Sequence, residues 1–333
     1  YASYTVNVKK ELTKDCFEIS ATEKSYDGSK SAVVTATLKD EYKADQNDVV
    51  KAEITAEFDK SDAGSRTVIY EITGISGKNA DKYVLSETAE NLKGEVNGTI
   101  RKAVVTVICA RVTTRTFDGT AQTADVSAMA NGRIFDISNY TVKYAGETEA
   151  VKVGEYSISI ELSDTASANY EVEPFNAVLK IVNAAQDIFA VENVPENVYY
   201  GDTFAVSATG ADGDVTYEIT DGGDIAEISA NGEVKVKDVG RVTIKATSKK
   251  DGYTDRTAVK TFEAKKRILT PSATAVNREY NGENGVSVDI ALSGGIVTGD
   301  TLTASASGSM INSDAGSGKI VYVSAIALSD NEK

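Results

Sequence analysis

The chain repeats itself at a period of about 80 to 90 residues, and this repeat limits the possible folds more than any other feature. A tripeptide that joins an aromatic residue to Gly and to Asp or Asn occurs at Tyr26-Asp27-Gly28, Phe117-Asp118-Gly119, Tyr200-Gly201-Asp202 and Tyr280-Asn281-Gly282. Successive aromatic residues are therefore 91, 83 and 80 positions apart. A period of this size indicates an array of small modules, each with its own core.

An alternating strand precedes each tripeptide and ends at a similar distance from it. The strands end at Lys10, Lys102, Ala184 and Lys266, and the aromatic residue follows 16, 15, 16 and 14 positions later. Used as boundaries, these ends define a closing strand at 1–10 and modules at 11–102, 103–184, 185–265 and 266–333. Because no stretch rich in Pro or in Gly and Ser separates the modules, we expect an elongated, semi-rigid rod.

Both ends of the chain are expected to be parts of incomplete modules within a longer protein. Residues 4–8, Tyr-Thr-Val-Asn-Val, have the pattern of a closing strand from a preceding module. The first and fourth modules share Asp-Ala-Gly-Ser at 62–65 and 314–317, and the fourth is expected to lack its final strands. An exposed strand edge is a route to pairing with another copy, so we expect a monomer with edge-strand association at these ends.

Composition and periodicity predict an all-β protein. The chain has 26 Gly and only 3 Pro, and apolar and polar residues alternate in Tyr156–Leu162 and Val242–Ala246, as half-buried strands require. Turn signals such as Asn231-Gly232 and Asp251-Gly252 lie between strands at hairpin spacing. No segment has a strong amphipathic helical pattern, and residues 77–93 are the best candidate for a helix.

Charge and hydropathy exclude two classes of partner. The net charge is -15, with 50 carboxylates against 35 Lys and Arg, which disfavours phosphate backbones and anionic membrane surfaces. No apolar stretch of the length needed to insert into a membrane occurs. The two cysteines, Cys16 and Cys109, lie in different modules, so we expect buried free thiols rather than a disulfide.

The residues that most enzymes need are largely missing, so we predict no enzymatic activity, no cofactor and no metal. The chain has no histidine, which removes every His-dependent triad and every His-ligated zinc or iron site. Residues 314–319, Asp-Ala-Gly-Ser-Gly-Lys, imitate a phosphate-binding loop but lack its first Gly and its final Ser or Thr. The acidic cluster Asp212, Asp214, Asp221 and Asp224 lacks the spacing of a calcium loop, and we interpret these residues as solvated turn acids.

One residue is singled out as a candidate ligand contact. Binding of sugars by β modules usually uses exposed aromatic residues, and the chain has no Trp. Tyr199 and Tyr200 are adjacent, so a strand directs them to opposite faces. Because Tyr200 holds the repeated aromatic position, we interpret it as a core residue, which leaves Tyr199 as the candidate for binding.

The third module resembles a known family on the basis of its strands and turns. Its Ile225–Val234 hairpin, with Asn231-Gly232 at the turn, is followed by Gly240-Arg241-Val242-Thr243-Ile244. These features are similar to those of group 2 bacterial immunoglobulin-like domains, although Tyr217 stands where that family often has Trp. The resemblance implies a small β sandwich for residues 185–265.

The other three modules resemble the YDG and MBG repeats of bacterial surface proteins, through the tripeptides, Asp-Ala-Gly-Ser and Ala168-Asn169-Tyr170. That resemblance implies a secreted or wall-attached, adhesin-like protein. The spacing leaves open whether these modules are immunoglobulin-like or β-grasp-like.

Two functions are consistent with these features. The first is a non-enzymatic structural stalk or adhesin segment of a bacterial surface or secreted protein. The alternative is a set of accessory modules that bind a glycan or a protein from the host or from a bacterial surface.

Overall fold

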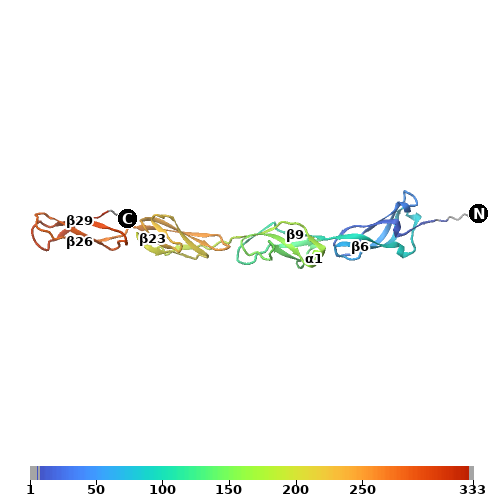
Figure 1. The fold of residues 1–333 in the computed structure, drawn as a ribbon, viewed down its shortest axis with the longest axis horizontal. Helices are drawn as coiled ribbons and strands as arrows, with labels where there is room; N and C mark the ends of the chain where they lie inside the picture. Colours follow the sequence, from blue (N-terminus) through green and yellow to red (C-terminus); the bar gives the residue numbers. More distant parts are fainter. Residues whose placement is uncertain (1–5, 7, 330–333) are drawn as a thin grey trace, which may run out of the picture. The chain divides into compact units, whose positions relative to one another are not determined.

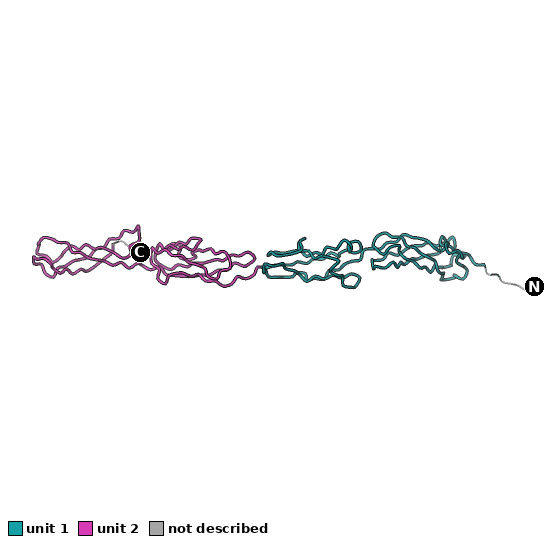
Figure 2. Tube along the Cα trace, turned by 90° about the horizontal axis from the view of Figure 1, so that it is seen from below, with its two compact units in different colours: residues 1–182 teal, residues 183–333 magenta. Residues whose placement is uncertain are grey.

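The computed structural model describes residue 6 and residues 8–329 of the chain (Figure 1). Most of the strand predicted at residues 4–8 lies outside this range. Contacts divide the chain into two compact units, residues 1–182 and residues 183–333 (Figure 2). The prediction of tandem all-β modules is confirmed: strands dominate, and the described residues contain one α-helix, α1 (Asp164–Asn169).

The first module is built on a six-stranded mixed sheet in the order β2-β4-β5-β6-β8-β3. Its strands are β2 (Phe17–Ala21), β3 (Lys24–Ser25), β4 (Val34–Leu38), β5 (Val49–Phe58), β6 (Gly64–Lys78) and β8 (Lys93–Arg101). A separate parallel pair joins β1 (Lys10–Leu12) to β7 (Tyr83–Leu85). Alternate residues of these strands, including Leu12, Val50 and Ile72, are buried together in the core.

The helix suggested for residues 77–93 is wrong. The segment holds the end of β6, two 3₁₀ turns, Ala80–Lys82 and Ala89–Leu92, and strand β7 between them. Tyr83 and Leu85 pack in the core while their backbone pairs with Lys10 and Leu12 of β1. This long-range pairing outweighs the weak local preference of the segment for a helix.

The second module is a sandwich of two four-stranded sheets, ordered β10-β16-β14-β13 and β12-β11-β9-β15. Its strands are β9 (Ala103–Cys109), β10 (Val112–Thr116), β11 (Val126–Ala130), β12 (Arg133–Ile134), β13 (Tyr140–Tyr144), β14 (Gly154–Leu162), β15 (Tyr170–Val172) and β16 (Val178–Val182). One residue, Lys102, separates β8 of the first module from β9 of the second. The predicted alternation of Tyr156–Leu162 is confirmed in β14, where Ile158 is buried.

The third module has its main sheet in the order β18-β25-β24-β21, a three-stranded sheet β19-β23-β22, and a pair β17-β20. The strands are β17 (Ala190–Glu192), β18 (Val198–Tyr199), β19 (Thr203–Ala205), β20 (Ser207–Thr209), β21 (Asp214–Asp221), β22 (Ala226–Ile228), β23 (Glu233–Val236), β24 (Gly240–Lys249) and β25 (Arg256–Lys265). Val242, Ile244 and Ala246 of β24 are fully buried, as their predicted alternation requires.

The fourth module has two small sheets, a pair β26-β28 and a three-stranded sheet β27-β29-β30. The strands are β26 (Thr270–Ala275), β27 (Gly285–Val286), β28 (Val288–Ser293), β29 (Thr303–Met310) and β30 (Val321–Ser329). Among the residues described after Ala264, none is buried. This module therefore has no closed hydrophobic core, in contrast to the other three.

One pairing is common to the first three modules and explains the repeated tripeptide. The strand that ends just before the aromatic residue (β3, β10 or β18) pairs in parallel with the closing strand of the same module (β8, β16 or β25). The backbone N–H of the aromatic residue then donates to a carbonyl at the end of the closing strand, from Tyr26 to Arg101, from Phe117 to Val182 and from Tyr200 to Lys265, at 2.8–2.9 Å. The tripeptide thus ties the start of each module to its end.

Core packing in the third module leads to a test of its fold. Replacement of the fully buried Ile244 by Ala is expected to lower the free energy of unfolding of this module by about 2–5 kcal/mol, because the cavity left in β24 cannot be refilled. Val259→Ala is the control, because Val259 is exposed on the neighbouring strand β25 and should cost well under half as much. Chemical denaturation measures both, and equal losses would contradict the assignment of the core.

Candidate functional site at the module junctions

The junction between the first and second modules is centred on an aromatic contact. The ring of Tyr26, from the first tripeptide, packs edge-to-face on Tyr170 of β15 with 5.2 Å between ring centroids. Phe135 packs against the same Tyr170 at 4.8 Å, and burial raises the pKa of the Tyr170 hydroxyl. Asn131 Nδ2 also donates to the Tyr26 carbonyl at 2.9 Å. The repeated aromatic residue of one module is therefore held by the next.

The buried side chain of Asn169 adds hydrogen bonds to this junction. Asn169 is the last residue of α1, whose first turn is capped by the Ser163 hydroxyl. Its Oδ1 accepts from the Ala63 N–H at 2.8 Å, and its Nδ2 donates to Asp62 Oδ1 at 3.2 Å. The Asp-Ala-Gly-Ser turn of the first module is thereby bound to the helix of the second, because a buried amide of this kind needs both of its partners.

The third and fourth modules meet through the tripeptide at Tyr200-Gly201-Asp202. Arg267 Nη2 makes an ion pair with Asp202 Oδ1 at 2.6 Å, and its Nε donates to the Tyr200 carbonyl at 2.6 Å. The Tyr200 hydroxyl donates to Asp300 Oδ1 at 2.9 Å, and this hydrogen bond is the main cause of the raised pKa of Tyr200. The interpretation of Tyr200 as a core residue is corrected here: its ring is half-buried and reaches the next module.

Tyr199, the candidate ligand contact, lies in the same region. It is half-buried at the end of β18 and lines a cavity of about 190 Å³ with Arg267, Ile268 and Gly294. This volume is below the range of about 300–1,000 Å³ that is typical of small-molecule sites. The structure thus brings Tyr199 to a junction beside a cationic side chain, and its role in binding remains a prediction.

Asp48 of the first module is the centre of a buried polar network. It accepts hydrogen bonds from the Tyr83 hydroxyl at 2.7 Å, from Asn79 Nδ2 at 2.6 Å and from the Asp45 N–H at 3.0 Å, and it forms an ion pair with Lys82 at 3.1 Å. These contacts, that of Tyr83 above all, hold the pKa of Asp48 far below its ordinary value despite its burial. The network fixes the turn before β7 to the start of β5.

The remaining sequence candidates do not assemble into a reaction centre. Cys16 is buried and Cys109 half-buried; both are free thiols, and burial raises the pKa of Cys109, which disfavours the reactive thiolate. Asp214 and Asp221 lie at opposite ends of β21, too far apart to share one ion. Within residues 8–329 no three His, Cys, Asp or Glu side chains gather at metal-binding distance.

Sequence reasoning found the elements of the junctions without finding the junctions themselves. The Asp-Ala-Gly-Ser turn, Ala168-Asn169-Tyr170 and the tripeptides were all recognisable as shared landmarks. What the landmarks contact could not be read from them, because Asn169 and Ala63 are 106 positions apart. One feature of the sequence could have indicated the junctions: these landmarks recur in several modules although they lie outside the alternating strands.

The depressed pKa of Asp48 predicts how the first module responds to acid. Its stabilising effect is fully present above the pKa of an unfolded Asp, about 3.9, and is lost as the pH falls below that value. Asp48→Asn should therefore lower the denaturation midpoint of this module at pH 7. The difference in midpoint between the variant and the wild type should become smaller below about pH 4. Asp40→Asn, at an exposed ion pair with Lys43, is the control and should have little effect at either pH. A difference in midpoint between Asp48→Asn and the wild type that does not change with pH would contradict the role of the Asp48 charge.

Comparisons with known families identify parts of the chain. The family model of the YDG domain matches residues 8–90 and 264–333, and that of the bacterial Ig-like domain (group 2) matches residues 202–259. The second module, residues 103–184, lies outside these matches, so its YDG or MBG character stays a prediction. No curated protein sequence matches this chain.

Several solved structures of multi-domain proteins are similar over long stretches. A tetra-tandem repeat in the extending region of a large adhesion protein is 14% identical, with coverage of 94% of this chain and 98% of that one and a TM-score of 0.28. The C-terminal fragment of intimin, in complex with the intimin-binding domain of the translocated intimin receptor, is 14% identical, with coverage of 77% and 65% and a TM-score of 0.21. Surface layer protein SbsC, domains 1–6, is 14% identical, with coverage of 93% and 50% and a TM-score of 0.22.

The predicted resemblances for the first, third and fourth modules are thus confirmed by independent family matches. Residues 8–90 and 264–333 of the chain are thus similar to the YDG domain, and residues 202–259 are similar to the bacterial Ig-like domain (group 2).

Proposed function

We propose that this chain is a non-enzymatic stalk or adhesin segment of a bacterial surface or secreted protein, located outside the cell. The observation that carries the proposal is the direct bonding between the first and second modules and between the third and fourth modules. At the first junction a single residue, Lys102, separates β8 from β9, and the side chains of Asn169 and Tyr170 bind the preceding module. Such junctions limit bending between neighbours, which a projecting stalk requires.

The chemistry of the junctions supports a permanent structural role. The bonds to Ala63, Tyr26 and Tyr200 are made to backbone groups, which every copy of a repeat provides whatever its side chains. When each module contacts only its neighbours, the stability of the array is approximately the sum of the stabilities of its modules and of their interfaces. Such an array can therefore be lengthened by adding modules. The acidic surface, with a net charge of -15, keeps such a chain soluble and disfavours non-specific adhesion to anionic surfaces.

The location outside the cell rests on the domain types. Both matched families are repeat or immunoglobulin-like modules, and the bacterial Ig-like match in particular supports a bacterial surface or secreted protein. In the described part of the chain, no helix has the length and apolar character needed to cross a membrane.

A ligand-binding role for accessory modules is the second candidate. Tyr199 is the observation that favours it, because this aromatic side chain lines a cavity beside Arg267, and the two could contact a sugar ring and its polar groups. The small volume of that cavity and the use of Arg267 in the junction are the reasons for ranking it second.

The stalk proposal predicts that the first junction is held by Asn169. In the full chain, Asn169→Ala should leave both modules folded while letting them reorient independently, because Ala63 and Asp62 lose their partner. Residual dipolar couplings measured by NMR should fit one common alignment tensor for residues 11–182 of the wild type and two separate tensors for the variant. Asn97→Ala, at an exposed position of β8, is the control and should keep the common tensor. Independent tensors in the wild type would contradict the proposal.

The ranking of the two functions is tested with a glycan array. A stalk should bind no glycan saturably, whereas accessory modules should bind one and lose that binding in Tyr199→Ala. Tyr322→Ala is the matched control, because Tyr322 is an exposed tyrosine on β30 away from the cavity. Saturable binding that is lost in Tyr199→Ala but kept in Tyr322→Ala would reject the pure stalk.

A further inference from the structure

A glycine of the third module lies against a valine of the fourth at their junction. A Cβ atom added at Gly201 would lie 2.4 Å from Cγ2 and 2.8 Å from Cγ1 of Val297. Carbon atoms that are not bonded to each other pack best at about 3.5–4.0 Å. Val297 lies between β28 and β29 of the fourth module. Its isopropyl group therefore occupies the space that a side chain at position 201 would need.

The third module holds Gly201 in place through its backbone. The Gly201 N–H donates to the Val236 carbonyl at 3.1 Å, and the N–H of the next residue, Asp202, donates to the Tyr199 carbonyl at 3.0 Å. Gly201 also has a φ of +79°, in the left-handed region that favours glycine. The backbone at this position is therefore fixed, and it cannot shift to make room for a side chain.

The fourth module contacts the tripeptide through a single turn at residues 297–300. The Asp300 N–H donates to the Val297 carbonyl at 3.0 Å and closes this turn. The Tyr200 hydroxyl donates to Asp300 Oδ1 at 2.9 Å. The two side chains of the turn thus contact two neighbouring residues, Tyr200 and Gly201, so a shift that relieved a clash at Gly201 would strain the hydrogen bond at Tyr200.

The glycine occupies a different position in the tripeptides of the first two modules. There it is the third residue, Gly28 or Gly119, with φ of +79° or +80°, and a Cβ added at either would have no packing neighbour within 4 Å. The second residue is Asp27 or Asp118 in those modules and Gly201 in the third module. The aromatic residue before it nevertheless makes the same backbone hydrogen bond to the closing strand in all three modules. Only the third of these modules therefore lacks a side chain at the position on which Val297 packs.

We propose that Gly201 determines which kind of module can follow the third one in the array. The surface formed by Tyr200 and Gly201 accepts a module that presents a valine and, three positions later, an acid on one turn, as Val297 and Asp300 do. A tripeptide with Asp at its second position excludes this turn, because its Cβ would overlap the valine. Selectivity of this kind comes from a clash with the wrong partner as much as from contacts with the right one. The inference goes beyond the proposed stalk function, because a stalk needs attached modules but no fixed order of them.

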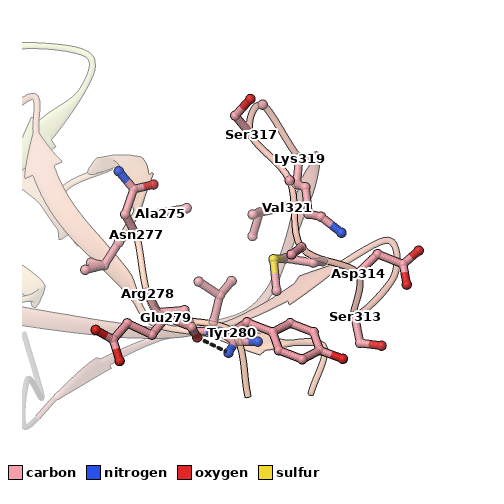
Figure 3. A pocket seen from close by; sticks show the side chains of 16 residues that line it. Ala275, Asn277, Arg278, Glu279, Tyr280, Ser313, Asp314, Ser317, Lys319 and Val321 are labelled. Atoms are coloured by element: carbon pink, nitrogen blue, oxygen red, sulfur yellow. Dashed lines mark hydrogen bonds between the residues drawn. The ribbon is translucent and has the colours of Figure 1, made fainter. Parts of the chain in front are cut away.

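This docking surface is separate from the groove of the fourth module. The groove has a volume of about 610 Å³ and lies between residues 275–280 and the turn at 313–319 (Figure 3). Val321 lines the groove, whereas Val297 and Asp300 are not among its lining residues. Substitutions of Val321 therefore change the fourth module away from the junction and serve as controls.

Gly201→Ala in the full chain should detach the fourth module from the third. Residual dipolar couplings measured by NMR for residues 185–265 and 266–329 should fit one common alignment tensor in the wild type and two separate tensors in the variant. Gly28→Ala is the matched control, because Gly28 has the same φ of +79° without a packing neighbour. It introduces the same backbone strain and should keep the common tensor of residues 11–182. Separate tensors for the third and fourth modules in the wild type, or a common tensor in Gly201→Ala, would overturn the proposal.

A compensating substitution distinguishes steric overlap from backbone strain. Val297→Ala removes both methyl groups that a Cβ at position 201 would overlap, and the closest remaining contact of that Cβ with residue 297 is 3.2 Å. Gly201→Ala combined with Val297→Ala should therefore regain the common tensor, whereas Gly201→Ala combined with Val321→Ala should not. If the first double variant keeps two tensors, or if the second regains one, the fit between Gly201 and Val297 is not what holds the junction and the proposal is wrong.

A substitution in the fourth module tests the fit even if Gly201→Ala unfolds the third module. Val297→Phe overfills the space above Gly201 and leaves the sequence of the third module unchanged, so it should also give two tensors. Val321→Phe, in the open groove, is its matched control and should keep one. A common tensor in Val297→Phe would reject the proposal and leave the stalk function untouched, because that function is tested at Asn169 in the first junction.

Discussion

The parallel pairing between the strand before the repeated aromatic residue and the closing strand is the interaction on which each complete module depends. It joins residues 66 to 76 positions apart, so its hydrogen bonds are made only after most of the module has folded. The closing strand then covers the long central strand, β6, β14 or β24, and the core is sealed from water. In the fourth module β29 is the only described partner of β30, and none of the residues described after Ala264 is buried.

The same pairing places the repeated aromatic residue where one module passes into the next. The closing strand leads within a few residues into the following module, so the residue tied to its end is available to both. Tyr26 uses this position to pack on Tyr170, and Tyr200 uses it to reach Asp300. Closure of a module and attachment to its neighbour are therefore coupled through one short motif. This coupling explains why these two junctions need no linker rich in Pro or in Gly and Ser.

The sequence predicted the features that depend on local pattern. The modules and their strands follow from period-two alternation and from a repeat of about 80 to 90 residues, and neither requires knowledge of distant contacts. The family resemblances rest on short motifs such as the tripeptides. The features that the sequence did not predict depend on contacts between residues that are far apart in the chain. Helix α1 spans six residues, which is too short for its pattern of apolar residues to show a helical period. The structural role of Asn169 depends on a hydrogen bond with Ala63, which is 106 positions away in the sequence. Residues 77–93 looked helical because the pairing of Tyr83 with Lys10 cannot be seen locally. Tyr200 looked like core because an aromatic residue in a repeat is usually buried, whereas here its hydroxyl has an acceptor in the next module.

Hydrogen exchange at the amides of the four repeated aromatic residues tests the central role of the closing strand most directly. In dilute, monomeric chain, the amides of Tyr26, Phe117 and Tyr200 should exchange slowly, since each donates to a closing-strand carbonyl, and the amide of Tyr280 should exchange at close to the rate of an unfolded peptide. Protection of Tyr280 equal to that of the other three in the monomer would contradict this account, as would rapid exchange at all four.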